Sequence, residues 1–90
     1  MYETSLIQTK TARTQMEKSL RLEYYLLQER LPGGEARYGV EVRCANGAGT
    51  EQKRVPDIAG TGDRIRELLA MLAAGLVTPT GLADVLQDWL

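Results

Sequence analysis

The stretch RYGVEVRCANG, residues 37–47, decides the fold. Its apolar positions recur every second residue. They are Tyr38, Val40, Val42 and Cys44. This period of two is typical of a β-strand with one buried face. The Asn46-Gly47 pair that follows is a strong signal for a tight hairpin. The stretch therefore predicts a strand that turns directly into an antiparallel neighbour.

Further strands are expected on both sides of this one. The apolar side chains on one face of residues 20–30 are Leu20, Leu22, Tyr24 and Leu26. Helix-forming residues are common there, so a helix is the alternative, but the alternation and the paired tyrosines favour a strand. Pro32 and two glycines follow in a turn. Residues 50–58 predict a more polar strand, and Pro56 suits an edge because proline cannot donate to a ladder.

The N-terminal segment has a weaker pattern. Residues 2–8 alternate weakly, so they form either a short edge strand or a disordered end. Residues 9–19 are polar and lack glycine and proline, and we interpret them as a mobile arm or a long connection. The predicted organisation is a polar N-terminal arm or edge strand over residues 1–19 and a single α+β domain over residues 20–90.

The last third of the chain predicts two amphipathic helices. Thr61 or Asp63 can cap the first helix, and Gly75 suits a left-handed cap at its end. The first apolar stripe consists of Ile65, Leu68, Leu69, Leu72 and Leu76. Thr78 followed by Pro79 predicts the start of the second helix. The second stripe consists of Leu82, Val85, Leu86, Trp89 and Leu90.

These strands and helices need one another because each has a single apolar face. The economical arrangement is an antiparallel sheet of three or four strands, followed by a C-terminal αα-hairpin packed on one face of the sheet. The predicted fold class is therefore α+β. In this arrangement Trp89 and Leu90 close the helix layer.

Composition argues against several classes of protein. The 90 residues are enough for one domain, and their net charge of −1 is unlike the basic character of most nucleic-acid and anionic-membrane binders. The chain has no histidine, the commonest general base and metal ligand. Its single cysteine favours a reducing cytoplasm, and residues 1–20 lack the apolar core of a signal peptide. The longest apolar run, residues 68–77, is too short to span a bilayer.

The residue patterns do not predict a catalytic or metal site. Cys44 shares a strand face with valines, and without a histidine to activate it a core thiol is the better interpretation. Asp84 and Asp88 lie one turn apart, where such pairs are usually just solvated. The glycines of residues 59–63 lack the spacing and the lysine of a phosphate-binding loop. We predict no enzyme activity, no cofactor and no metal.

The sheet face opposite the main apolar stripe is the predicted interaction surface. Tyr25 and Leu27 project there, and exposed apolar side chains on a sheet often mark a partner site. The alternative is that the N-terminal segment folds over them. A basic outer face is a second feature, with a solvated surface as the alternative; its residues are Arg37, Arg43, Lys53 and Arg54. The candidate interaction residues are Tyr25, Leu27, Arg43, Lys53 and Arg54.

Three function classes remain. A small non-catalytic binding or regulatory module is favoured by the lack of histidine and by the balanced charge. It would bind a protein partner or a second copy of the chain through an exposed sheet face or edge, with no role for a membrane. The alternative is nucleic-acid association through a basic N-terminal arm, which lacks interleaved aromatic residues. The arm's basic residues are Lys10, Arg13, Lys18 and Arg21. An enzyme is least favoured.

Three stretches resemble a small family of bacterial proteins of unknown function, best known from spore-forming Gram-positive genomes. They are YGVEV at 38–42, DI at 57–58 and LVTPTGLADVLQDWL at 76–90. The resemblance covers roughly residues 22–90 and not the N-terminal arm. It implies a β-hairpin layer with two C-terminal helices, and it implies no activity or ligand. The shared residues are structural ones: Tyr38, Gly39, Thr78, Pro79, Leu82 and Asp84.

Overall fold

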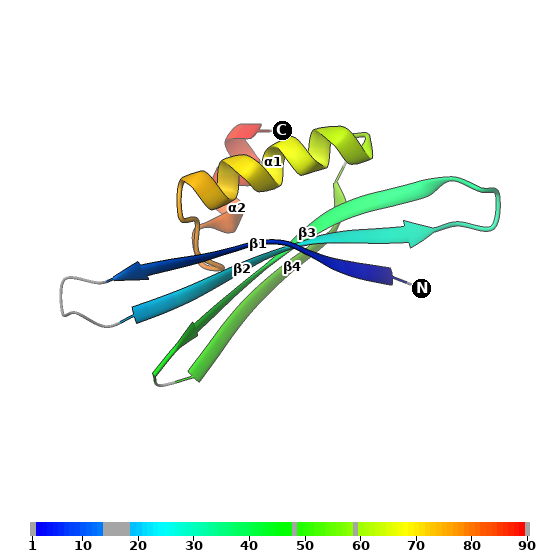
Figure 1. The fold of residues 1–90 in the computed structure, drawn as a ribbon. Coiled ribbons are helices and arrows are strands. Elements are labelled where there is room, and N and C mark those ends of the chain that lie inside the picture. Colours follow the sequence, from blue (N-terminus) through cyan, green and yellow to red (C-terminus); the bar gives the residue numbers. More distant parts are fainter. Residues whose placement is uncertain (1, 14–18, 48, 59, 90) are drawn as a thin grey trace.

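The computed structural model describes residues 2–13, 19–47, 49–58 and 60–89. Four strands precede two helices in this part of the chain (Figure 1). The strands are β1 (Tyr2–Arg13), β2 (Ser19–Arg30), β3 (Ala36–Asn46) and β4 (Gly49–Ile58), and the helices are α1 (Gly62–Ala74) and α2 (Leu82–Trp89). All neighbouring strands are antiparallel, in the order β1-β2-β3-β4. The predicted α+β class and antiparallel sheet are confirmed.

Strand β1 is longer than its sequence indicated. It pairs with β2 from Tyr2 to Arg13, with a shift of register between Leu6 and Gln8. Residues 9–13 therefore belong to the sheet, and their interpretation as a mobile arm or a long connection is wrong. Residues 14–18 lie outside the described residues. The polar composition was misleading because β1 is an edge strand, and edge strands often carry charged and polar side chains that discourage pairing with another chain.

The β3–β4 hairpin forms where the Asn-Gly pair predicted a turn. Asn46 and Gly49 are the last paired residues, and the Oδ1 atom of Asn46 accepts a hydrogen bond from the Gly49 backbone N at 3.0 Å. Strand β4 lies at the edge of the sheet, as Pro56 indicated. The turn chemistry of this segment therefore decides which strands become neighbours.

The end of this hairpin away from the turn contains a bulge that requires a glycine. The register of β3 and β4 shifts between Tyr38 and Val40, where Gly39 is buried. A Cβ atom on Gly39 would lie 2.2 Å from the Val55 carbonyl oxygen and 2.5 and 2.6 Å from backbone atoms of Pro56. These distances are far below normal contact distances, so the two backbones can approach only because residue 39 has no side chain.

One apolar core joins the sheet to the helices. Strands β2, β3 and β4 contribute Leu22, Tyr24, Leu26, Val40, Val42, Cys44 and Ile58. The helices contribute Ile65, Leu68, Leu69, Leu72, Ala73, Leu82 and Leu86. Helix α1 contacts β1, β2 and β3, and Figure 1 shows both helices on the same side of the sheet. The Tyr24 hydroxyl also donates a hydrogen bond to the Val77 carbonyl at 2.9 Å, which ties the sheet to the α1–α2 connection.

Both predicted helix starts have a threonine whose side chain accepts a backbone hydrogen bond. The Oγ1 atom of Thr61 accepts from the Arg64 backbone N at 3.3 Å, and the Oγ1 atom of Thr78 accepts from the Gly81 backbone N at 3.3 Å. Thr61 is the N-cap of α1, as predicted. Thr78 begins a turn instead, because α2 itself starts only at Leu82.

The end of α1 differs from the prediction. The left-handed residue is Leu76, with φ 50°, whereas Gly75 has φ −88°. The Leu76 N–H donates to the Ala73 carbonyl at 3.1 Å, and the Val77 N–H donates to the Leu72 carbonyl at 3.0 Å. These two bonds form a Schellman motif with a leucine in the position that usually holds glycine. Leu76 is therefore exposed, and its assignment to the apolar stripe of α1 is wrong.

Trp89 closes the helix layer only in part. Its side chain is half-buried against the core, and the Arg64 guanidinium carbon lies 4.5 Å from the centre of one of its rings. Leu82 and Leu86 of the same stripe are buried. Leu90, the other residue expected to close the layer, lies outside the described residues.

Candidate functional site

The sheet side away from the helices is built by residues that alternate with the core residues. Directly opposed residues on paired strands lie on the same side of a sheet. One such row crosses all four strands and consists of Leu6, Tyr25, Glu41 and Arg54. The adjacent row on β2, β3 and β4 consists of Glu23, Arg43 and Gln52. We refer to these seven residues as the open face.

Glu41 lies at the centre of the open face and is fully buried. Its Oε1 atom accepts a hydrogen bond from Arg54 Nε at 2.6 Å, and its Oε2 atom accepts one from Arg43 Nε. A buried carboxylate without partners would be strongly destabilising, and the two charge-assisted bonds offset that cost. The bond to Glu41 is the main reason that the pKa of Arg43 is raised, so this guanidinium stays charged. Glu41 therefore holds two arginine side chains in place.

Tyr25 holds Arg43 from a second direction. The Arg43 guanidinium carbon lies 4.4 Å from the centre of the Tyr25 ring, within the range of a cation–π contact. Arg43 Nη1 lies 3.5 Å from the Tyr25 hydroxyl, at the long limit of a hydrogen bond. Burial raises the pKa of Tyr25, and Glu23 adds to this effect, so the phenol is neutral at ordinary pH. The uncharged Tyr25 ring therefore packs against the Arg43 guanidinium.

Leu27 lies on the same side of β2 as Tyr25, but its side chain is not accessible to a partner. Its side chain is fully buried, so its expected exposure is wrong. Leu6 is instead the exposed apolar side chain of the open face, with 50% of its surface accessible. It reaches this position because β1 pairs it with Tyr25 in the sheet. The segment around Leu6 therefore extends the sheet beside β2 and does not fold over Tyr25.

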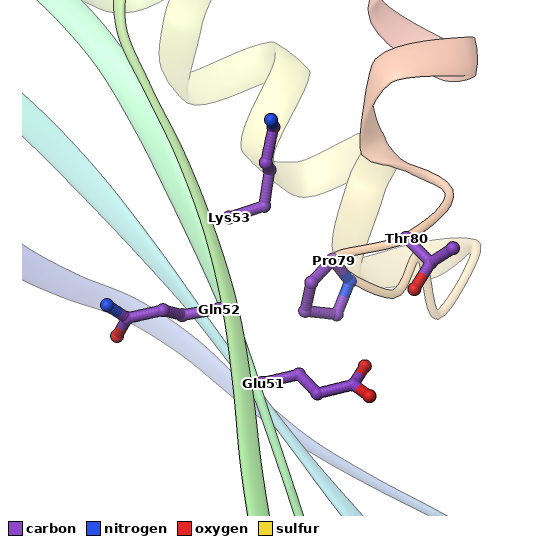
Figure 2. Close-up of a pocket in the computed structure, with 5 residues that line it drawn as sticks. All are labelled: Glu51, Gln52, Lys53, Pro79 and Thr80. Atoms are coloured by element: carbon purple, nitrogen blue, oxygen red, sulfur yellow. The ribbon is translucent and has the colours of Figure 1, made fainter.

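Lys53 lies on the other side of β4 from Arg54. It pairs with Val42, a core residue, and Figure 2 shows Lys53 and Gln52 pointing to opposite sides of the strand. An open groove between β4 and the α1–α2 connection is lined by Glu51, Gln52, Lys53, Pro79 and Thr80. The grouping of Lys53 with Arg54 in one surface is wrong because successive residues of a strand point to opposite faces.

The basic residues of the N-terminal segment are divided between the two sides of the sheet. Lys10 pairs with Leu22, a core residue, so it lies on the helix side of β1. Arg21 lies on the other side, two residues before Glu23, and its guanidinium is 3.7 Å from the Glu23 carboxylate. Lys18 lies outside the described residues. Lys10 and Arg21 therefore do not belong to one basic surface.

Cys44 is a buried core thiol, as predicted. Burial raises its pKa, and the nearby Glu51 carboxylate adds to this effect. Asp84 and Asp88 are exposed on α2. Within the described ranges, no three side chains of His, Cys, Asp or Glu are grouped so that they could hold a metal ion. Nor does this part of the chain contain a helix that is long and apolar enough to cross a membrane.

Comparison with known proteins identifies a family. The family described as "Family of unknown function (DUF6514)" matches residues 3–90. The chain belongs to this family. The match includes β1, so the resemblance reaches beyond residues 22–90 and its restriction to that range is corrected. No curated protein and no solved structure matches the chain.

Proposed function

We propose that the protein is a small non-catalytic binding module that holds a protein partner on the open face. The observation that carries this proposal is the row of side chains around buried Glu41, with Leu6 at one end and Arg54 at the other. Tyrosine and arginine contribute most to protein interfaces, and Tyr25 and Arg43 are already stacked here. Side chains that are held in place before binding lose less conformational freedom in the complex.

The division of the sheet into a covered side and a free side supports the proposal. In this proposal α1 and α2 form one layer on one face, since residues of both belong to the same core. The opposite face then remains available to a partner. Cys44, the strongest potential nucleophile in the chain, is buried with a raised pKa, which supports a role without catalysis.

Affinity capture from the organism that carries the gene tests this proposal. The tagged wild-type protein is compared with a variant carrying Leu6→Ser and Tyr25→Ser. The matched control is Met71→Ser, because Met71 is a similarly exposed apolar residue on α1. We expect a partner that the wild type and the control retain and the double variant loses. Equal retention by all three proteins, each checked for folding by circular dichroism, contradicts a binding role for the open face.

Self-association is tested in the same proteins. Light scattering at micromolar concentration shows whether the partner is a second copy, since two-fold pairing is the commonest way to cover such a face. A dimer that the Leu6 and Tyr25 substitutions dissociate, and that Met71→Ser leaves intact, identifies the second copy. If the wild-type protein is a monomer, the proposed partner is a different protein.

A further inference from the structure

The outward edges of two arginines are free for a ligand on the open face. Glu41 accepts hydrogen bonds from the Nε atoms of Arg43 and Arg54. Arg43 Nη1 lies near the Tyr25 hydroxyl. The other guanidinium nitrogens of these two arginines have no hydrogen-bond partner among the described residues. The Arg43 and Arg54 side chains are 35% and 48% exposed, while Glu41 is 0% exposed. We infer that Arg43 and Arg54 bind a carboxylate of an acidic segment of the partner protein, an inference that rests on the proposed function.

The local charge of three residues at the centre of the open face favours an anionic ligand. Two guanidinium groups share one buried carboxylate, so the Arg43–Glu41–Arg54 cluster retains a positive charge. Glu23, the other acid of the open face, lies 3.7 Å from Arg21 and makes only the smallest contribution to the raised pKa of Arg43. The planar guanidinium group matches a carboxylate through paired N–H donors. A carboxylate from the partner therefore complements this cluster in both charge and shape.

The arginines are held in position before any ligand arrives. Arg43 is fixed by its bond to Glu41 and by the ring of Tyr25, and Arg54 is fixed by its own bond to Glu41. A surface arginine normally loses much side-chain freedom when it forms an ion pair, which is why exposed pairs contribute little. The arrangement around Glu41 removes part of that loss. It is therefore better suited to binding than arginines on an ordinary solvated surface.

Leu6 indicates which second feature the ligand should have besides its carboxylate. Leu6 on β1 lies in the same row as Arg54 on β4, three strands away. Neighbouring strands are about 4.8 Å apart, so the two positions are about 14 Å from each other. An extended segment covers this distance in about four residues. The expected ligand is thus an extended peptide with an apolar residue about four positions from an aspartate or glutamate.

An acidic protein segment fits this surface better than a nucleic acid. Residues 57–90 carry two basic and five acidic side chains, and the whole chain has a net charge of −1. A polyanion would be repelled by this overall field, and its affinity depends on many phosphate contacts. A single carboxylate requires only the local positive charge of Arg43 and Arg54.

Peptide titration of the full-length wild-type protein tests this inference. The probes are the capped peptides acetyl-LGSGE-amide and acetyl-LGSGQ-amide, which differ only in the carboxylate, and binding is followed through the Nε–Hε signals of Arg43 and Arg54 by nuclear magnetic resonance. We expect the acidic peptide to bind with a Kd on the order of 1 mM. The amide peptide should bind about two- to five-fold more weakly.

Two variants test whether the acidic peptide binds to the arginines of the open face. Arg54→Lys keeps a positive charge beside Glu41 but removes the planar group, so the acidic peptide should bind about three-fold more weakly. Lys53→Gln, on the other side of β4, should leave the affinity unchanged. If Arg54→Lys does not fold, the comparison of the two peptides on the wild-type protein still decides the question.

Three results overturn the inference. Equal binding of the two peptides, with shifts at Leu6 and Tyr25, leaves the open face as a binding surface but removes carboxylate recognition. If neither peptide shifts the arginine signals, Arg43 and Arg54 do not form a carboxylate site. The proposed function is refuted by a different result, namely capture of the partner that does not depend on Leu6 and Tyr25. Tighter binding of a thymidine dodecanucleotide than of the acidic peptide, on the same arginine signals at physiological salt, identifies a nucleic-acid surface instead.

Discussion

Replacing Gly39 by alanine tests the close approach of β3 and β4. The added Cβ would lie 2.2 Å from the Val55 carbonyl oxygen and 2.5 Å from the nearest backbone carbon of Pro56. Carbon atoms in contact are normally about 3.5–4.0 Å apart, so β4 must move by about 1 Å or more. Overpacking a well-packed site costs about 1–3 kcal/mol. We expect the upper end of this range, about 3 kcal/mol, because backbone atoms cannot rotate away as a side chain does.

Chemical denaturation measures this effect, with two other glycines as controls. Gly33→Ala should change the free energy of unfolding by less than about 0.5 kcal/mol, since its Cβ would meet nothing within 4 Å. Gly34→Ala is also unobstructed, but Gly34 has φ 85°, so a loss of about 1 kcal/mol is expected. A Gly39→Ala variant as stable as Gly33→Ala would refute the bulge geometry of β4.

Four further predictions concern single side chains. Trp89→Ala should lower the free energy of unfolding by about 2–3 kcal/mol, less than for a fully buried tryptophan, and the native emission of a fully solvated indole would contradict its docking. Burial, with a smaller effect of Cys44, raises the pKa of Tyr24 to about 12 from 10.0, so its neutral form stabilises the fold below pH 10. About 2–3 kcal/mol should be lost as the pH rises from about 10 to about 12, and urea unfolding should show a smaller loss for Tyr24→Phe. The Cys44 thiol should react with a thiol reagent much more slowly in the native protein than in urea, and equal rates would show that it is accessible. Leu76→Gly should raise the melting temperature, with a gain of up to about 1 kcal/mol, because glycine adopts a positive φ more easily than leucine.

Local patterns determined much of the fold. The alternation in β2 and β3 correctly indicated their buried faces, and the stripes of α1 and α2 correctly indicated most of the helix side of the core. Asn46 marked the hairpin, Thr61 marked the start of α1, and the lone Cys44 was correctly assigned to the core. These predictions succeed because the periods of a strand and of a helix, and the chemistry of turns and caps, are properties of a few consecutive residues.

The open face was only partly predictable. Alternation in β3 already placed Glu41 and Arg43 on the same side, which was the available signal for the charged cluster. Arg54 reaches Glu41 from thirteen residues away, through the pairing of β3 with β4. Leu6 reaches Tyr25 only because of the register of β1.

The two errors have different causes. Lys53 was expected beside Arg54, although alternation along β4 already puts successive residues on opposite sides of the sheet. Leu27 was expected to be exposed and is buried, and alternation alone does not show this. A sequence shows which residues alternate, but strand register, bulges and the side covered by helices are set by contacts between distant segments. The amino-acid sequence by itself therefore determined the strands, the turns and the apolar stripes. Only the tertiary structure decided which side chains meet on the open face, because a bulge or shift of one residue moves side chains to the other face.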